Sequence, residues 1–227
     1  MVGSCNGLVC FKISDKNTRV QDPIYICNPV TREYVYLPKY IHGGDRDSRY
    51  RGFFICGFGY NYSTHEYKVV RIYYRSGMSL DVSKVQVYTL GSGQGWRDKG
   101  NITHLLSPIT SCVCANGALY WSGYGKIMAF DLADEEFRVI PLPPVSEEVS
   151  GAVCLRLLRG YVSVVHFIEG DEPTSIHVWV LKKKKKYTSS ETREPVFDDL
   201  WYWNEEFSFS CGTRDDIYLP FAVTKSN

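Results

Sequence analysis

The sequence predicts an all-β domain built of antiparallel, β-propeller-like blades. Short apolar runs alternate with turn residues, segments with helical periodicity are missing, and aromatic residues make up 15% of the chain, with 17 tyrosines among them. Bulky flat and β-branched side chains fit a pleated sheet better than the crowded turns of a helix. The length of 227 residues suits one such domain, spanning residues 1–227. An antiparallel β-sandwich is the alternative fold.

The first half of the chain contains apolar runs that glycine, proline or polar residues separate. The strands expected there are residues 6–13, 23–28, 30–37, 53–60, 67–74, 85–90 and a strand that opens at Trp96. Asn28 and Pro29 predict a turn, and residues 61–66 predict the connection of a hairpin. The glycine-rich residues 91–95 predict a further turn, because no helix or Lys-Ser/Thr pair follows them as a phosphate-binding loop requires.

The second half repeats this organisation. The strands expected there are residues 112–115, 118–122, 127–132, 137–142, 153–158, 161–167 and 176–181. Asn116 and Gly117 predict a two-residue hairpin turn, in which both residues adopt a positive φ. Residues 201–204 and 217–223 predict strands without a clear closing partner. An incomplete last blade is one interpretation of this tail.

Three of the predicted strands align with one another, at residues 85–90, 127–132 and 176–181. Their starts lie 42 and 49 residues apart. This spacing is typical of four-stranded propeller blades, which repeat about every 40 to 50 residues. With insertions, the chain holds about four or five blades.

Charge and cysteine content narrow the range of partners and compartments. A net charge of +1 and a pI near 7.5 give no overall field that attracts nucleic acid or an anionic membrane. No apolar run of about eighteen residues is found, and no Cys-x-x-Cys pair accompanies the eight cysteines. The first residues have neither the basic start nor the apolar core of a secretory signal peptide. We therefore expect a reducing compartment, the cytoplasm or the nucleus, and neither nucleic acid nor membrane as a partner.

A series of short motifs resembles those of a known family. The motifs are Ser4-Cys5-Asn6-Gly7-Leu8-Val9-Cys10, Asn28-Pro29-Val30-Thr31-Arg32-Glu33, Gly57-Phe58-Gly59-Tyr60, Tyr67-Lys68-Val69-Val70-Arg71, Asn116-Gly117-Ala118-Leu119-Tyr120-Trp121, Phe130-Asp131-Leu132 and Phe137-Arg138-Val139-Ile140-Pro141-Leu142-Pro143. In this order and spacing they resemble the F-box-associated domain of plant F-box proteins, a kelch-like substrate-recognition domain. The resemblance covers about residues 4–181, and residues 182–227 depart from it.

The resemblance implies a function in protein recognition. It implies the substrate-recognition part of an SCF-type, cullin-based ubiquitin ligase, in which a separate F-box docks the ligase adaptor. No F-box motif precedes Ser4 in this sequence. We therefore expect a protein substrate as the partner, and contact with the adaptor only through an F-box that this sequence does not contain. The alternative function is that of a β-propeller lectin or a carbohydrate-active enzyme.

No motif in the sequence indicates catalysis, a cofactor or a metal. Gly-x-Ser-x-Gly is absent, and the five histidines show no metal-ligand spacing. Cys112 and Cys114 point to one face of a strand, but no neighbouring histidine or cysteine completes a tetrahedral site. We therefore expect a protein that is not an enzyme and that needs no cofactor.

Residues in polar loops and in one aromatic cluster are the candidates for partner binding. The candidates are Arg46, Arg49, Arg51, Arg75, Trp201 and Trp203. Guanidinium groups and large aromatic side chains are enriched at protein interfaces. The alternatives are that the arginines are solvated loop charges and that the tryptophans belong to the core between blades. The lysines at 182–186 predict a solvated hairpin tip, with a phosphate-binding or nuclear-import signal as the other interpretation.

Overall fold

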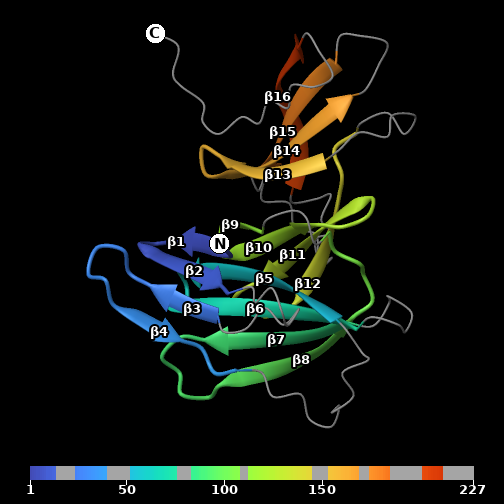
Figure 1. Ribbon diagram of the computed structural model, residues 1–227. Helices are drawn as coiled ribbons and strands as arrows, with labels where there is room; N and C mark the ends of the chain where they lie inside the picture. Colours follow the sequence, from blue (N-terminus) through green and yellow to red (C-terminus); the bar gives the residue numbers. More distant parts are fainter. Residues whose placement is uncertain are drawn as a thin grey trace, which may run out of the picture. The chain divides into compact units, whose positions relative to one another are not determined.

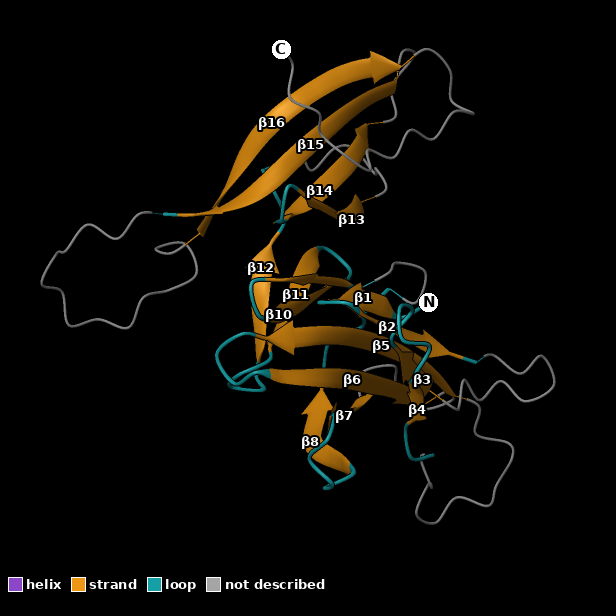
Figure 2. Ribbon diagram, turned by 90° about the vertical axis from the view of Figure 1, so that its left-hand side faces the viewer, coloured by secondary structure: helices purple, strands orange, loops and turns teal. Residues whose placement is uncertain are grey.

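The computed structural model describes residues 1–13, 24–39, 52–75, 83–107, 112–144, 153–168, 174–184 and 201–211. These residues form sixteen strands and, within the described ranges, no helix. The strands make four four-stranded antiparallel sheets, and in each sheet the spatial order follows the sequence (Figures 1 and 2). Such sheets are propeller-like blades, whereas a sandwich divides its strands between two sheets. The predicted all-β, propeller-like fold class is therefore confirmed.

The first two sheets contain β1 to β8. The first sheet consists of β1 (Gly3–Cys5), β2 (Leu8–Lys12), β3 (Ile24–Cys27) and β4 (Tyr34–Tyr36). The second sheet consists of β5 (Gly52–Asn61), β6 (Glu66–Arg75), β7 (Ser83–Thr89) and β8 (Trp96–Ile102). Its longest pairing joins β5 to β6, from Gly52 opposite Arg75 to Asn61 opposite Glu66.

The last two sheets contain β9 to β16. The third sheet consists of β9 (Val113–Ala115), β10 (Ala118–Ser122), β11 (Lys126–Asp131) and β12 (Phe137–Pro141). The fourth sheet consists of β13 (Val153–Leu158), β14 (Tyr161–Ile168), β15 (Thr174–Lys183) and β16 (Trp201–Cys211).

The alignment of three strands that the sequence predicted is confirmed. Residues 85–90, 127–132 and 176–181 fall on β7, β11 and β15, and each of these is the third strand of its sheet. The first sheet completes the series with β3. Equivalent strands thus recur once in each blade, because each blade is one sequence repeat.

Several predicted strand boundaries were wrong. The run 6–13 begins in a turn, because Asn6 and Gly7 connect β2 to a short strand, β1, that the sequence did not reveal. The run 30–37 is shortened to β4, because the residues before it form a turn. The tail was also misread: β16 pairs with β15 from Thr174 opposite Cys211 to Lys183 opposite Trp201, so this blade has four strands. The strand predicted at 217–223 lies outside the described residues.

The chain divides into two compact units. One comprises residues 1–124 and 128–139, and the other comprises residues 125–127 and 140–227. The prediction of a single domain remains a prediction. Each unit is described by itself below.

Two-residue turns join the first two strands of three blades. They are formed by Asn6-Gly7, Asn116-Gly117 and Arg159-Gly160, and all six residues have positive φ, from 46° to 84°. Positive φ at both positions is the signature of the type I′ hairpin turn, whose twist matches that of the flanking strands. The turn predicted at Asn116-Gly117 is therefore confirmed.

A four-residue turn with shared chemistry occurs in three places. Asn28, Asn61 and Asp131 each precede four turn residues that a glutamate follows, and the last turn residue has a positive φ in each case. Each Oδ1 accepts a backbone N–H from the residue two positions later, at 2.8 to 2.9 Å. The side-chain oxygen thus accepts a backbone N–H within the turn and stabilises the turn conformation. Asp131 therefore acts as a turn residue.

The core of the first unit lies between its sheets. Ile72, Val87, Trp121 and Phe130 are among the fully buried residues that join the second sheet to the third. A second cluster joins the first sheet to the second, and Cys10, Ile26 and Phe58 are among its members. Burying a large apolar side chain stabilises a fold by about 1.5 to 3 kcal/mol. These inter-sheet contacts therefore hold the turns of this unit in fixed positions.

Candidate binding site

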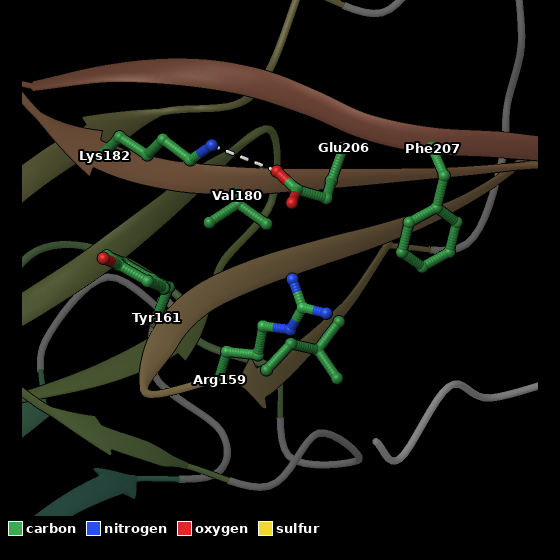
Figure 3. Close-up of a pocket in the computed structure, with 7 residues that line it drawn as sticks. Arg159, Tyr161, Val180, Lys182, Glu206 and Phe207 are labelled. Atoms are coloured by element: carbon green, nitrogen blue, oxygen red, sulfur yellow. Dashed lines mark hydrogen bonds and ion pairs between the residues drawn. The ribbon is translucent and has the colours of Figure 1, made fainter. Parts of the chain in front are cut away.

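A recess on the fourth sheet is the candidate binding site of the second unit. It has a volume of about 150 Å³ and is lined by Leu158, Arg159, Tyr161, Val180, Lys182, Glu206 and Phe207. Figure 3 shows side chains from the β13–β14 turn, β15 and β16 directed toward a common hollow. The recess therefore depends on strands that are distant in sequence and adjacent in the sheet.

The floor of the recess is apolar. Leu158 and Val180 are 3% and 5% exposed, and Phe207 is partly buried against the core cluster of the same sheet. Val180 and Lys182 are two residues apart on β15, so they point to the same face. Tyr161 is 46% exposed at one side of the hollow. An apolar side chain of a partner can therefore enter without leaving a polar group unpaired.

A β-bulge shapes the charged rim of the recess. Val178 pairs with Phe207 and Trp179 pairs with Glu205, so Glu206 is the additional residue on β16. Bulges redirect side chains. The Glu206 carboxylate accepts a hydrogen bond from Lys182 Nζ at 3.0 Å, and both side chains are about one-third exposed (Figure 3). Such a pair contributes about 0.2 to 1 kcal/mol, so it can be exchanged for a partner's charge at small cost.

The rim carries two cationic groups and one carboxylate. Arg159 is exposed in the type I′ turn, and Lys182 is half-buried on β15. A guanidinium group binds a carboxylate through two parallel hydrogen bonds. The recess can therefore hold an apolar side chain that has a carboxylate beside it. The sequence drew attention to Lys182 only as part of the lysine run and gave no sign of Arg159 or Glu206 as site residues, because the three come from different elements and share no motif.

The two tryptophans predicted as anchors lie on β16. Trp203 is half-buried and donates a hydrogen bond from Nε1 to the Pro141 carbonyl oxygen at 2.9 Å. Trp201 is half-buried with the Lys183 ammonium 5.7 Å from its ring centroid. Neither lines the recess. Their role in partner binding remains a prediction.

The predicted arginines are not brought into this site. Arg46, Arg49 and Arg51 lie outside the described residues. Arg75 is the last residue of β6, and the structure describes its backbone only. Of the lysine run, Lys182 and Lys183 end β15 and contact Glu206 and Trp201. The solvated-tip interpretation is therefore incomplete for these two lysines.

A buried ionic cluster in the first unit holds one of the four-residue turns. Glu135 in the β11–β12 turn is paired with Lys68 on β6 at 3.0 Å and with Lys99 on β8 at 3.2 Å. Arg97 on β8 donates to both of its carboxylate oxygens, one at 2.7 Å. Lys68 also donates to the Leu132 carbonyl oxygen at 2.7 Å. The cluster thus joins the second and third sheets.

Electrostatics make Glu135 a structural group. Burial by itself raises the pKa of the Glu135 carboxyl, but hydrogen bonds from Arg97, Lys68 and Lys99 outweigh burial and hold the pKa at about 2. A carboxylate with this pKa stays ionised at neutral pH and is a poor general acid or base. Its three cationic partners all come from the second sheet, Lys68 from β6 and Arg97 and Lys99 from β8.

Two cysteines that the sequence singled out have a packing explanation. Cys112 and Cys114 lie over two glycines of β5, and a Cβ added to Gly57 or Gly59 would meet their sulfurs at 2.8 and 2.7 Å. Cys5 Sγ lies 3.9 Å from Cys114 Sγ, and this hydrogen bond lowers the pKa of the Cys5 thiol to about 7. Within the described ranges, no group of three or more His, Cys, Asp or Glu side chains fits a metal ion. No helix long and apolar enough to cross a membrane was found in the same part of the chain.

Comparison with known proteins identifies the family. The family described as F-box associated beta propeller domain matches residues 1–215. Among the similar Arabidopsis thaliana proteins, F-box protein At3g07870 is 32% identical over 63% of this chain and 38% of its own length. F-box protein At5g65850 is 33% identical over 80% of this chain and 44% of its own length. Putative F-box protein At1g47730 is 29% identical over 97% of this chain and 54% of its own length.

These comparisons set both the family and the extent of the match. The chain spans about two fifths to one half of the length of these relatives. The four-stranded, propeller-like blades agree with the family's description. The chain belongs to the F-box-associated β-propeller family.

Proposed function

We propose that this chain recognises the protein substrate of an SCF-type, cullin-based ubiquitin ligase. The observation that carries the proposal is the family match over residues 1–215, together with relatives that are named F-box proteins. In this role the chain binds substrate, and an F-box segment contacts the ligase adaptor. The recess on the fourth sheet supports the proposal, because its apolar floor and charged rim suit a protein side chain.

The proposal also concerns compartment and substrate chemistry. It places the chain in the cytoplasm or the nucleus, and the seven cysteines whose side chains the structure describes are free, as a reducing compartment favours. A substrate segment with an apolar residue next to Asp or Glu fits the recess. Its apolar side chain would contact Leu158 and Phe207, and its carboxylate would face Arg159.

Capture from plant cells tests this function. A tagged chain is compared with the variant Arg159→Glu, Tyr161→Ala, which alters the rim at two exposed positions. Arg138→Glu is the matched control, because Arg138 is 59% exposed on the other unit and pairs only with the exposed Asp134 among the described residues. Proteins that bind the wild type and the control but not the recess variant are the candidate substrates.

The decisive measurement is the fate of those candidates. We expect them to accumulate and to lose ubiquitin conjugates when cullin ligases are inhibited in the same cells. Unchanged levels and unchanged ubiquitination of all of them would refute the proposed function.

A further inference from the structure

Three turns of the first unit meet around a second recess, which we call the turn recess. It has a volume of about 280 Å³ and is lined by the β5–β6 turn with Asn61, by the β9–β10 turn with Asn116 and by the β11–β12 turn with Asp131. Its lining residues include no Lys, Arg or His. Asp131 is the single charged residue among them, so the turn recess is polar and weakly anionic.

Asn61 lines this recess and has a buried hydrogen-bond donor without a partner among the described residues. The residue is 4% exposed, and its Oδ1 accepts hydrogen bonds from the Ser63 backbone N–H at 2.9 Å and from Ser63 Oγ at 2.8 Å. The bond from the Ser63 backbone fixes which end of the amide is oxygen, because an N–H group only donates. The Nδ2 group has no partner among the described residues. Buried polar groups are nearly always hydrogen-bonded, so this donor points to a missing acceptor.

Asp131 supplies the complementary group on another turn. Its Oδ1 accepts from the backbone N–H groups of Ala133 at 2.8 Å and Asp134 at 3.2 Å. Within the described part of the chain, Oδ2 accepts no hydrogen bond. The turn recess therefore combines a donor that lacks an acceptor with an acceptor that lacks a donor.

We propose that the turn recess binds the side-chain carboxamide of an Asn or Gln residue of the protein substrate. The carboxamide oxygen accepts from Asn61 Nδ2, and its NH₂ group donates to Asp131 Oδ2. Lysine and arginine side chains carry donors only, so they leave Asn61 unpaired. A carboxylate carries acceptors only and is repelled by Asp131. The inference rests on the proposed role in substrate recognition and names one chemical group that is recognised.

Peptide selection with the purified full chain tests the contact. A random dodecapeptide display library is the probe, and the affinity of enriched peptides is measured by fluorescence polarisation. We expect the enriched peptides to share an Asn or Gln, and its replacement by Leu to weaken binding at least tenfold, because a site that hydrogen-bonds a polar group rejects the analogue that lacks it.

Isosteric variants test the two protein groups. Asn61→Asp keeps the oxygen that accepts from Ser63 and removes the donor, and Asp131→Asn keeps the oxygen that holds its turn and removes the charge. Each is expected to weaken binding at least tenfold. Asn28→Asp is the matched control, because Asn28 Oδ1 holds an equivalent turn through Val30 N at 2.9 Å and does not line the turn recess. Its affinity should stay within twofold of the wild type.

The double variant Asn61→Asp, Asp131→Asn gives the sharpest result. It exchanges donor and acceptor at constant net charge, and a carboxamide can rotate to match, so we expect affinity within about threefold of the wild type. Unchanged affinity of both single variants overturns the proposal, and so do enriched peptides that share no carboxamide. A glycan array is the third measurement. If the chain binds glycans but no peptide, and Asn61→Asp abolishes the glycan binding, the proposal is also overturned. The peptide assay contains no ligase, so its result does not depend on the cullin experiment. Failure of the cullin experiment would refute the proposed function, and the peptide assay would still decide whether the turn recess binds a carboxamide.

Discussion

Neutralising Glu135 should destabilise the first unit strongly at neutral pH. The Glu135→Gln variant removes the carboxylate that Arg97, Lys68 and Lys99 share, and it leaves Lys68, whose side chain is 5% exposed, with the partly exposed Glu66 and a carbonyl oxygen. Removing one partner of a buried pair costs about 3 to 5 kcal/mol. The glutamine can retain the turn, because it differs from glutamate only in the carboxamide.

The pKa provides an independent estimate of the same effect. A carboxyl pKa of about 2 in the folded chain, against an ordinary 4.5, corresponds to about 3 kcal/mol at neutral pH. Because the folded-state pKa is depressed, this stabilisation is fully present above the unfolded pKa and is lost as the pH falls from about 5 toward 2. The difference in unfolding free energy between wild type and variant should therefore shrink over that range.

Denaturant unfolding followed by tryptophan fluorescence at pH 7 and at pH 3 measures both effects. The control is Asp134→Asn, because the neighbouring Asp134 pairs with Arg138 while both side chains are 59% exposed, and such pairs contribute at most about 1 kcal/mol. At pH 7 the Glu135 variant should lose about 3 kcal/mol and the control less than about 1 kcal/mol. Equal stability of the two variants, or a loss in Glu135→Gln that does not change with pH, would refute the reasoning.

Two further predictions rest on the structure, and a third rests on the sequence alone. Gly117→Val should lower the unfolding free energy by about 1 to 3 kcal/mol, because φ is 76° at Gly117 and β-branched residues avoid this region; an unchanged melting temperature contradicts it. Gly59→Ala should destabilise by about 1 to 3 kcal/mol, because its Cβ would lie 2.7 Å from Cys114 Sγ, and adding Cys114→Ala should restore part of the loss; thermal melts that show no recovery argue against this contact. Reversing Arg46, Arg49 and Arg51 to Glu together should weaken partner capture with an unchanged circular dichroism spectrum, and capture at wild-type level would remove this loop from the binding surface.

Strands with an apolar face could be predicted from the sequence, and polar outer strands could not. The third strands β7 and β15 were found because alternate side chains enter a core. The strand β16 is mostly exposed beyond Trp203 and contains Glu205, Ser208 and Ser210, so its pairing with β15 depends on backbone hydrogen bonds that leave no side-chain pattern. The short strand β1 was missed because Gly3 and Ser4 are not strand-forming residues.

The candidate sites were harder to predict than the strands for a related reason. Lys68 and Glu135 meet because two sheets pack together, and Glu206 reaches Lys182 because of a bulge; neither event has a local sequence signal. The sequence does carry one signal for the turn recess. At each four-residue turn, an Asn or Asp is followed five residues later by Glu. This pattern marks two of the residues that line the turn recess, Asn61 and Asp131.

Each of the two recesses lies wholly within one compact unit, so the geometry of each is independent of the other. Their charges differ, because the recess on the fourth sheet has Arg159, Lys182 and Glu206 at its rim, whereas the turn recess has Asp131 alone. Contacts between exposed charges weaken as salt shortens the screening length to about 3 Å at 1 M, while a neutral carboxamide contact is far less sensitive. A partner held by Arg159 should therefore dissociate with rising salt, and one held by Asn61 should remain bound. The salt dependence of a captured substrate thus indicates which recess holds it before any residue is changed.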